Sequence, residues 1–161
     1  KKTPTEYIIQ KATELGVSKI LPLVTERTIT KSLNLKRFQD IAIEASEQCE
    51  RITIPEIFPL QKLYDVIDKW GDKRTIYYAD ETMRHEKQST NNFNKLIKAP
   101  SGAILVGPEG GFTMKEKSYL KQKKFIIPIN FGQRILKSDT AVITGLVFWQ
   151  ILNGDMKTIF K

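Results

Sequence analysis

The sequence predicts an α/β domain with a mostly parallel sheet that is covered by helices on both faces. Segments with strand-like and helix-like apolar patterns alternate along the chain. Helices that connect successive strands favour parallel pairing, with both faces of the sheet buried. The chain has 161 residues, a normal length for one domain, and we find no repeat, low-complexity segment or linker in it. We therefore expect one domain over residues 1–161.

The first half begins with a helix whose ends are well marked. Thr3 is a suitable N-cap, Pro4 suits the first helical position, Glu6 completes a capping box, and Gly16 ends the helix. Further elements expected in this half are a strand over 19–25, a helix over 35–51, a short edge strand over 54–58 and a helix over 60–70. The helix over 35–51 carries Cys49 on its apolar side, where we expect a small core residue.

The second half repeats the alternation. Its expected elements are a strand over 75–79, a polar loop over 81–92, a short helix over 93–98, a strand over 102–106, a helix after Thr113, a strand over 125–131 and a helix over 139–152. Thr113 and Glu116 form a second capping box. We expect at least one of Tyr77 and Tyr78 in the core and His85 in solvent. The last helix is apolar nearly all round, which favours a role in both the core and a dimer interface.

Composition narrows the class of partner. Lys and Arg number 26 against 18 Asp and Glu, so the net charge is +8. Such a charge favours a polyanion, and nucleic acid is preferred to membrane because no basic amphipathic helix stands out. A surface that is simply rich in lysine is the plainer alternative. The apolar runs are too short to cross a bilayer. The single cysteine excludes an internal disulfide, nothing suggests a metal site, and we expect a cytoplasmic protein.

A glycine-rich loop, Gly107-Pro-Glu-Gly-Gly111, follows the predicted strand 102–106. In open α/β sheets the carboxyl ends of strands are where ligands bind. The pattern is neither G-x-G-x-x-G nor a P-loop, so phosphate binding is only weakly indicated. A tight turn that needs positive φ would explain the glycines. It would not explain Glu109.

A second loop, over 131–141, also follows a strand and opens a helix. Gly132 permits a turn, and either Ser138 or Asp139 is expected to cap the helix. A turn and a cap do not account for the middle of the loop, which reads Arg-Ile-Leu-Lys over 134–137. An apolar pair between two cations suggests a pocket for a ring with polar edges.

Together the two loops resemble the signature of the RsmE family of RNA methyltransferases. GPEGGF and FGQRILKSDTA are similar to that family's GPEGG-[FL]-[ST] and LG-x-RILR-x-ETA. Further similar positions lie upstream, in the right order, at 11–17, Pro22, 25–27, 44–51 and Pro55. The resemblance extends over essentially the whole chain.

The resemblance implies a SPOUT-type methyltransferase domain with a trefoil knot near its C-terminus. It implies S-adenosylmethionine as cofactor and N3 of a uridine in 16S (small-subunit) ribosomal RNA as methyl acceptor. It also implies a homodimer, and an additional PUA-like RNA-binding domain that precedes this one in the family. The residues implied to line the cofactor are Leu105, Val106, Gly107, Glu109, Gly110 and Gly111 on one side and Phe131, Gly132, Ile135, Leu136, Thr140 and Ala141 on the other.

Deprotonation of the uridine is the chemical problem that the site has to solve. A base must accept the N3 proton, or a cation must stabilise charge on the uracil oxygens. Arg134 and Lys137 are the candidate cations, and Glu109 and Asp139 are candidates for base or for positioning. Lys137 and Asp139 stand where the family usually has Arg and Glu, which keeps the sign of each charge but replaces the bidentate guanidinium of Arg by an ammonium group. RNA contacts are expected from Arg27, Gln48 and Arg51.

Three other functions stay open at this point. A SPOUT methyltransferase could act on tRNA or on another ribosomal position. A non-catalytic RNA-binding or ribosome-assembly module could retain the fold with a decayed site. A nucleotide-binding protein could use the glycine-rich loop for phosphates, and binding of ATP without S-adenosylmethionine would then be expected.

Overall fold

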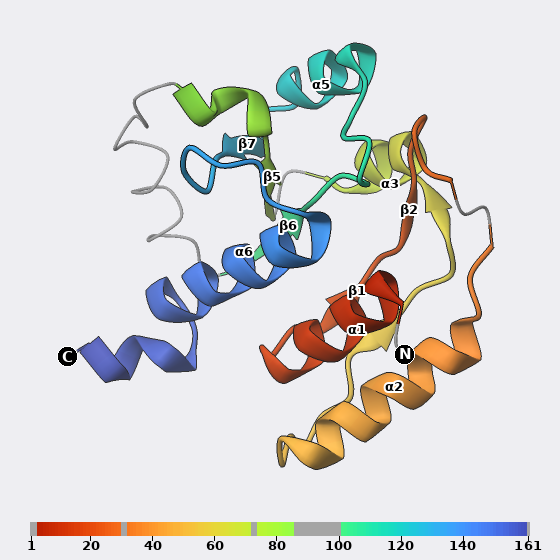
Figure 1. Cartoon of the computed structure of the whole chain (residues 1–161), viewed down its shortest axis with the longest axis vertical. Coiled ribbons are helices and arrows are strands. Elements are labelled where there is room, and N and C mark those ends of the chain that lie inside the picture. The colour runs from red at the N-terminus through yellow and green to blue at the C-terminus, as the bar shows by residue number, and fades with distance from the viewer. Residues whose placement is uncertain (1–2, 30–31, 72–73, 86–100, 161) are drawn as a thin grey trace.

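The computed structural model describes residues 3–29, 32–71, 74–85 and 101–160 (Figure 1). Its helices are α1 Pro4–Glu14, α2 Leu35–Gln48, α3 Leu63–Lys69, α5 Met114–Lys121 and α6 Ser138–Leu152, with the 3₁₀ helices η1 Glu81–His85 and η2 Asp155–Phe160. Its strands are β1 Lys19–Ile20, β2 Leu23–Val24, β3 Glu56–Ile57, β4 Gln61–Lys62, β5 Thr75–Ala79, β6 Gly102–Leu105 and β7 Ile126–Ile129. The helix predicted over 93–98 lies outside the described residues. Within the polar loop predicted over 81–92, the described part forms η1.

Every strand pair of the described residues is parallel, so the prediction of an α/β fold with parallel pairing is confirmed. The pairs fall into separate small sheets, β1 with β3, β2 with β4, and a three-stranded sheet in the order β6-β5-β7. The single strand predicted over 19–25 is wrong: Pro22 lies between β1 and β2, which pair with different partners. Proline has no N–H to donate to a continuous ladder.

The three-stranded sheet is covered on both faces, as predicted. On one face, Ile76 and Tyr78 of β5 pack in a core with buried residues of α3 and α5. On the other face, Tyr77 lies against Trp149 of α6, with ring centroids 6.0 Å apart. Alternate residues of a strand point to opposite faces, which is why neighbouring tyrosines serve different cores. Both tyrosines are buried.

Helices α1 and α2 form a separate layer with β3 (Figure 1). Ile9 of α1 packs with Phe38, Ile41 and Ala42 of α2 and with Ile57. The predicted capping box at the start of α1 is confirmed, because Thr3 accepts from Glu6 N and Glu6 accepts from Thr3 N.

Helix α2 ends three residues earlier than predicted. It stops at Gln48, and Glu50 adopts the left-handed φ of 57°. Cys49 is therefore the C-cap and is exposed, so the prediction of a core cysteine is wrong. The left-handed Glu50 directly after Cys49 turns the chain away from the helix axis, so the residues after Gln48 do not continue the apolar stripe.

Helix α6 approaches the sheet closely at Gly145. A Cβ added there would lie 2.9 Å from the Ile104 side chain of β6 and 3.1 Å from Phe131. The other end of α6 is fixed to α1, because Gln150 Nε2 donates to the Leu15 carbonyl at 2.6 Å. Helix α6 thus lies between α1 and the sheet, in agreement with Figure 1. None of the described helices has the length and apolar content needed to cross a membrane.

Candidate functional site

The candidate site is built at one edge of the three-stranded sheet. Because β5, β6 and β7 are parallel, the segments that follow them, residues 80–85, 106–112 and 130–137, leave the sheet at the same edge. This is the edge at which open α/β sheets bind ligands. Both loops singled out from the sequence lie here, and η1 follows β5 between them.

The loop 107–111 is a tight turn, as one interpretation of its glycines predicts. Gly111 N donates to the Pro108 carbonyl at 2.8 Å, and Gly111 has φ of +66°. Gly107 is required for a different reason, since a Cβ there would lie 3.0 Å from the ring of Phe112. Phe112 is buried edge-on against Tyr78 of the central strand, with centroids 5.4 Å apart. The turn is therefore fixed to the core of the sheet, and Glu109 at its tip is exposed.

Arg27 lies across this loop, although we predicted for it a contact with RNA. Its Nη1 donates to the Gly110 carbonyl at 2.7 Å. The preceding residue is held by Glu116, a fully buried carboxylate that accepts from Glu26 N at 2.9 Å and from Thr113 N at 2.8 Å. The predicted capping box of Thr113 and Glu116 is confirmed, and the same carboxylate positions Arg27. The RNA contact of Arg27 stays a prediction.

The second loop turns at Gly132, whose φ is +101°. Gly132 N donates to Asn130 Oδ1 at 3.0 Å. Beyond the turn Arg134 is exposed, and Ile135 has 66 % of its surface exposed. The two loops contact each other where Ser138 Oγ donates to Glu109 Oε1 at 3.4 Å.

Helix α6 begins one residue earlier than predicted, and its cap differs. Lys137 occupies the N-cap position without a side-chain cap bond, and Ser138 is the first helical residue. Neither Ser138 nor Asp139 caps the helix, so that prediction is wrong. Asp139 Oδ1 instead accepts from Thr140 N at 2.7 Å and from the Thr140 hydroxyl at 3.3 Å.

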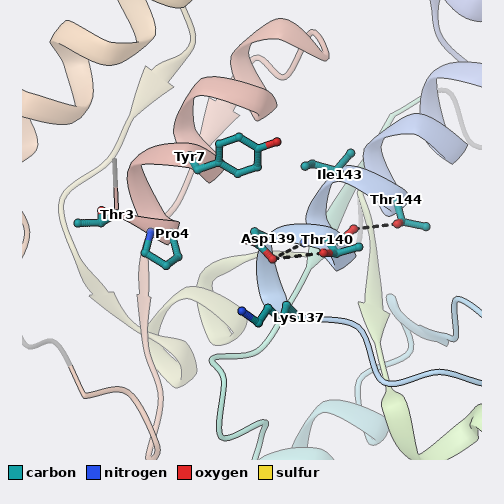
Figure 2. A pocket seen from close by; sticks show the side chains of 8 residues that line it. All are labelled: Thr3, Pro4, Tyr7, Lys137, Asp139, Thr140, Ile143 and Thr144. Atoms are coloured by element: carbon teal, nitrogen blue, oxygen red, sulfur yellow. Dashed lines mark hydrogen bonds between the residues drawn. The ribbon is translucent and has the colours of Figure 1, made fainter. Parts of the chain in front are cut away.

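A groove of about 870 Å³ runs between the start of α6 and the start of α1 (Figure 2). Lys137, Asp139 and Thr140 line it from α6, opposite Tyr7. The remaining lining residues are Thr3, Pro4, Ile143 and Thr144. Two of the four predicted catalytic residues thus share one groove. Glu109 is not among its lining residues and contacts Ser138, the residue between Lys137 and Asp139.

The other predicted cofactor residues differ in exposure. Leu105 and Ala141 are buried, and Leu105 packs in the core of the three-stranded sheet. Phe131 packs its ring parallel to that of Phe148, with centroids 6.2 Å apart. Val106 and Leu136 are half-buried.

Sequence reasoning missed a set of buried charges beneath the loops. Asp80 is buried directly after the central strand, with Lys117 Nζ 3.7 Å and Lys121 Nζ 3.1 Å from its carboxylate oxygens. Burial acts to raise the pKa of Asp80, but hydrogen bonds from Thr82 and Lys121 outweigh it, and the pKa lies below its ordinary value. Lys117 is 6 % exposed and forms a 2.7 Å ion pair with Glu81. The position of Asp80 at the carboxyl end of a buried strand was the signal that could have revealed it.

Arg51 has a structural task that the sequence did not suggest. Its Nη1 and Nη2 donate to the carbonyls of Thr13 and Val17 at 2.8 and 2.6 Å, where α1 ends. Orphan carbonyls at a helix C-terminus need such donors. Gln48 is exposed at the end of α2. RNA contacts by Arg51 and Gln48 stay predictions.

We expect Arg51→Met to destabilise the chain by about 1–3 kcal/mol, because two part-buried carbonyl partners lose charged donors. Urea unfolding followed by circular dichroism measures this difference. Arg37→Met is the matched control, since Arg37 forms an exposed ion pair with Glu6 on the same helix α1. Equal unfolding midpoints for Arg51→Met and Arg37→Met would contradict the structural role.

Among the described residues, no group of three or more His, Cys, Asp or Glu side chains is placed to hold a metal ion. The candidate site is a set of loops that carry cationic side chains and carboxylates at the surface. A network of charged residues lies beneath these loops. Its distinctive parts are glycine turns, exposed apolar side chains and backbone groups. Such parts suit an organic ligand with a planar ring.

Comparison with known proteins gives a consistent result. Residues 1–150 match the family described as RNA methyltransferase domain. A protein of Rickettsia conorii named ribosomal RNA small subunit methyltransferase E is 36 % identical over 154 residues, which cover 94 % of this chain and 61 % of that protein. A protein of the same name from Buchnera aphidicola (subspecies Schizaphis graminum) is 37 % identical over 164 residues, covering 97 % of this chain and 63 % of that protein. The chain thus spans about three fifths of the length of these relatives.

Solved structures share the fold. The ribosomal RNA small subunit methyltransferase E of Neisseria gonorrhoeae, bound to S-adenosyl methionine, superposes with a TM-score of 0.83 at 28 % identity, covering 96 % of this chain and 63 % of that one. A putative methyltransferase from Legionella pneumophila, in complex with the same cofactor, gives 0.81 at 31 % identity, covering 96 % and 64 %. With residues 1–150 matched, the resemblance to the RsmE family is confirmed, and the chain belongs to the family of RNA methyltransferase domains.

Proposed function

We propose that this chain transfers a methyl group from S-adenosylmethionine to N3 of a uridine in small-subunit ribosomal RNA. The observation that carries the proposal is the meeting of loops 107–111 and 131–140 at the carboxyl edge of the sheet, joined by Ser138 and Glu109. The names of the relatives and the cofactor bound in two structural neighbours support it.

The residues present fit such a cofactor. A Cβ built at Gly132 would meet no described atom within 4 Å, so there is open room above this turn. Ile135, two thirds exposed, offers an apolar surface for a flat ring. The two sets of loop residues named from the sequence, 105–111 and 131–141, would hold the cofactor with backbone groups and apolar side chains. When bound, the cofactor supplies a methyl group on a sulfonium, activated for transfer.

The chain's own residues have to prepare the acceptor. Lys137 and Arg134 are exposed cations that would stabilise negative charge on the uracil oxygens as N3 loses its proton. Asp139 and Glu109 are the carboxylates that would accept that proton or orient the base. Asp139 lies with Lys137 in the α1–α6 groove, which favours it as the nearer of the two to a bound base. The in-line geometry of methyl transfer makes alignment by these residues the main source of rate.

The charge of the chain suits an RNA substrate. Its net charge is +8, and phosphate contacts supply much of the affinity of RNA-binding proteins. Arg27, Arg51 and Gln48 are proposed contacts, with part of the Arg27 and Arg51 guanidinium groups already bound to backbone carbonyls. A ribosomal RNA substrate agrees with the expected cytoplasmic location.

The family resemblance adds three proposals about architecture. The first is a trefoil knot that involves the loops of the second half. The second is a homodimer, which the partly exposed Phe148 on the apolar helix α6 supports. The third is that residues 1–161 act as the methyltransferase domain beside a PUA-like RNA-binding domain.

Calorimetric titration with S-adenosylmethionine, S-adenosylhomocysteine and ATP tests the cofactor site. We expect the first two to bind and ATP not to bind. Methyl transfer is then measured on small ribosomal subunits and on tRNA, with the product identified as N3-methyluridine by nucleoside mass spectrometry. Methylation of tRNA alone would favour another SPOUT activity, and RNA binding without cofactor binding in a folded sample would favour a non-catalytic module. ATP binding alone would favour a nucleotide-binding protein.

A further inference from the structure

We infer that the 3₁₀ helix η1, Glu81–His85, is a common support for both cofactor loops, with Lys117 and Asn130 as its positioning residues. The inference deepens the proposed function and rests on it for the identity of the ligand. Helix η1 directly follows the central strand β5, between the strands that lead into the two loops. Figure 1 shows it in green, beside α5 and above the loop that follows β7.

The first connection leads to the glycine-rich loop. Lys117 of α5 is 6 % exposed, and its Nζ donates to Glu81 Oε1 at 2.7 Å. The same oxygen of Glu81 lies 3.2 Å from the place where a Cβ of Gly111 would be. The Glu81 carboxylate therefore lies against the one residue of this turn that has left-handed φ, and Lys117 holds it there.

The second connection leads to the other loop. Asn130 is 6 % exposed and uses both ends of its amide. Its Nδ2 donates to the Met83 carbonyl of η1 at 2.9 Å, and its Oδ1 accepts from Gly132 N at 3.0 Å. Gly132 is the left-handed residue of this turn, with φ of +101°. Each connection thus ends on the glycine that sets the course of a cofactor loop.

Helix η1 is itself firmly anchored, as a support must be. Asp80 accepts at Oδ1 from Thr82 N at 3.1 Å and from the Thr82 hydroxyl at 2.6 Å, while its backbone carbonyl accepts from Met83 N. Asp80 N donates to the Ile129 carbonyl of β7 at 2.9 Å. The buried Asp80 carboxylate also faces Lys117 and Lys121. These bonds leave η1 little freedom to move independently of the sheet.

Stability alone is a weak explanation for this arrangement. Burying a lysine between two carboxylates costs desolvation energy, and well-packed apolar residues of the same volume are often as stable. Positioning explains why both connections run through η1 to the two turns. It predicts that breaking the connection to one loop makes the backbone of the other loop open more often. An ion pair that only stabilises the fold does not predict this effect.

Hydrogen exchange of the chain without cofactor tests the coupling. Lys117→Met breaks the first connection, and its reporter is the Gly132 amide in the opposite loop. Asn130→Asp keeps the acceptor for Gly132 but sets a carboxylate against the Met83 carbonyl, and its reporter is the Gly111 amide, bonded to Pro108. We expect each far reporter to exchange roughly tenfold faster, equivalent to about 1.4 kcal/mol of local opening.

Controls separate coupling from general destabilisation. The amide of Tyr77 in β5 should keep its exchange rate, because only global unfolding exposes it. Lys123→Met is the matched control, because Lys123 lies just beyond α5 and forms an ion pair with Asp68 of α3. This variant should leave the exchange rates of both reporter amides unchanged. Glu81→Gln replaces Lys117→Met if that variant does not fold. Faster exchange at the near loop alone, or an equal rise at Tyr77, would overturn the inference.

Cofactor titration then separates this inference from the proposed function. We expect Lys117→Met and Asn130→Asp each to weaken S-adenosylmethionine binding about tenfold, and the double variant less than a hundredfold, because both act through η1. Multiplicative losses would overturn the common support. If the unchanged chain binds no cofactor while the far reporters still respond, the support stands and the proposed function fails.

Discussion

Replacement of Gly111 by valine is expected to abolish binding of S-adenosylmethionine at accessible concentrations, a loss of at least about a hundredfold in affinity. Gly111 has φ of +66°, which a β-branched residue adopts only at a cost of about 1–3 kcal/mol. The added side chain would also meet the Glu81 carboxylate, 3.2 Å from the Cβ position. The turn must then open, and the backbone that would face the cofactor moves with it.

Gly71→Val is the matched control for this prediction. Gly71 has a similar φ of +73°, but an added Cβ meets no described atom within 4 Å. It follows α3, away from the carboxyl edge of the three-stranded sheet. Both variants should lose comparable stability in thermal unfolding, and only Gly111→Val should lose the cofactor in calorimetry. Unchanged affinity in folded Gly111→Val would remove the loop 107–111 from the cofactor site.

The second large effect is expected for Lys137→Ala, which should slow methyl transfer by about 10²–10³ while cofactor affinity changes little. Lys137 is exposed at the start of α6 and takes part in none of the ion pairs found among the described residues, so its charge is available to a substrate. It lines the α1–α6 groove beside Asp139. A cation there would stabilise the uracil anion in the transition state more than the neutral base.

Single-turnover methylation of small ribosomal subunits measures this rate separately from binding. Lys137→Arg should retain or raise the activity, because the family usually has arginine at this place. Lys124→Ala, an exposed lysine beyond α5, controls for the loss of one positive charge. An equal reduction in Lys137→Ala and Lys124→Ala would mean that Lys137 contributes only general attraction for RNA.

Elements with strong local signals were predicted accurately from the sequence. The capping boxes at Thr3 and Thr113 mark helix starts because donor and acceptor lie three residues apart. Strand β5 has the predicted bounds, since its apolar run is bounded by polar residues and buried on both faces. The end of α2 was missed because nothing in the sequence around Glu50 requires its left-handed φ.

The candidate site was predictable only in part, for a related reason. Glycine patterns reveal turns, so both loops could be found in the sequence. The groups that hold those loops come from distant segments: Arg27 reaches Gly110 across 83 residues, and Lys117 reaches Glu81 across 36. Such contacts follow from the tertiary fold, and they produce no periodic pattern in the sequence from which they could be predicted. Arg51 illustrates this, because its hydrogen bonds to the end of α1 could not be told from a surface charge available to RNA.

The order β6-β5-β7 has a consequence for the newborn chain. The central strand is made first, and both of its neighbours follow it in sequence. While the polypeptide emerges from the ribosome, β5 therefore presents two unpaired edges until β6 has left the exit tunnel, and one unpaired edge until β7 has followed it. Its five residues, Thr-Ile-Tyr-Tyr-Ala, carry no charge to discourage pairing with another nascent copy. Slow translation after residue 79 should therefore lower the yield of folded protein, and β5 is the segment through which aggregation would begin.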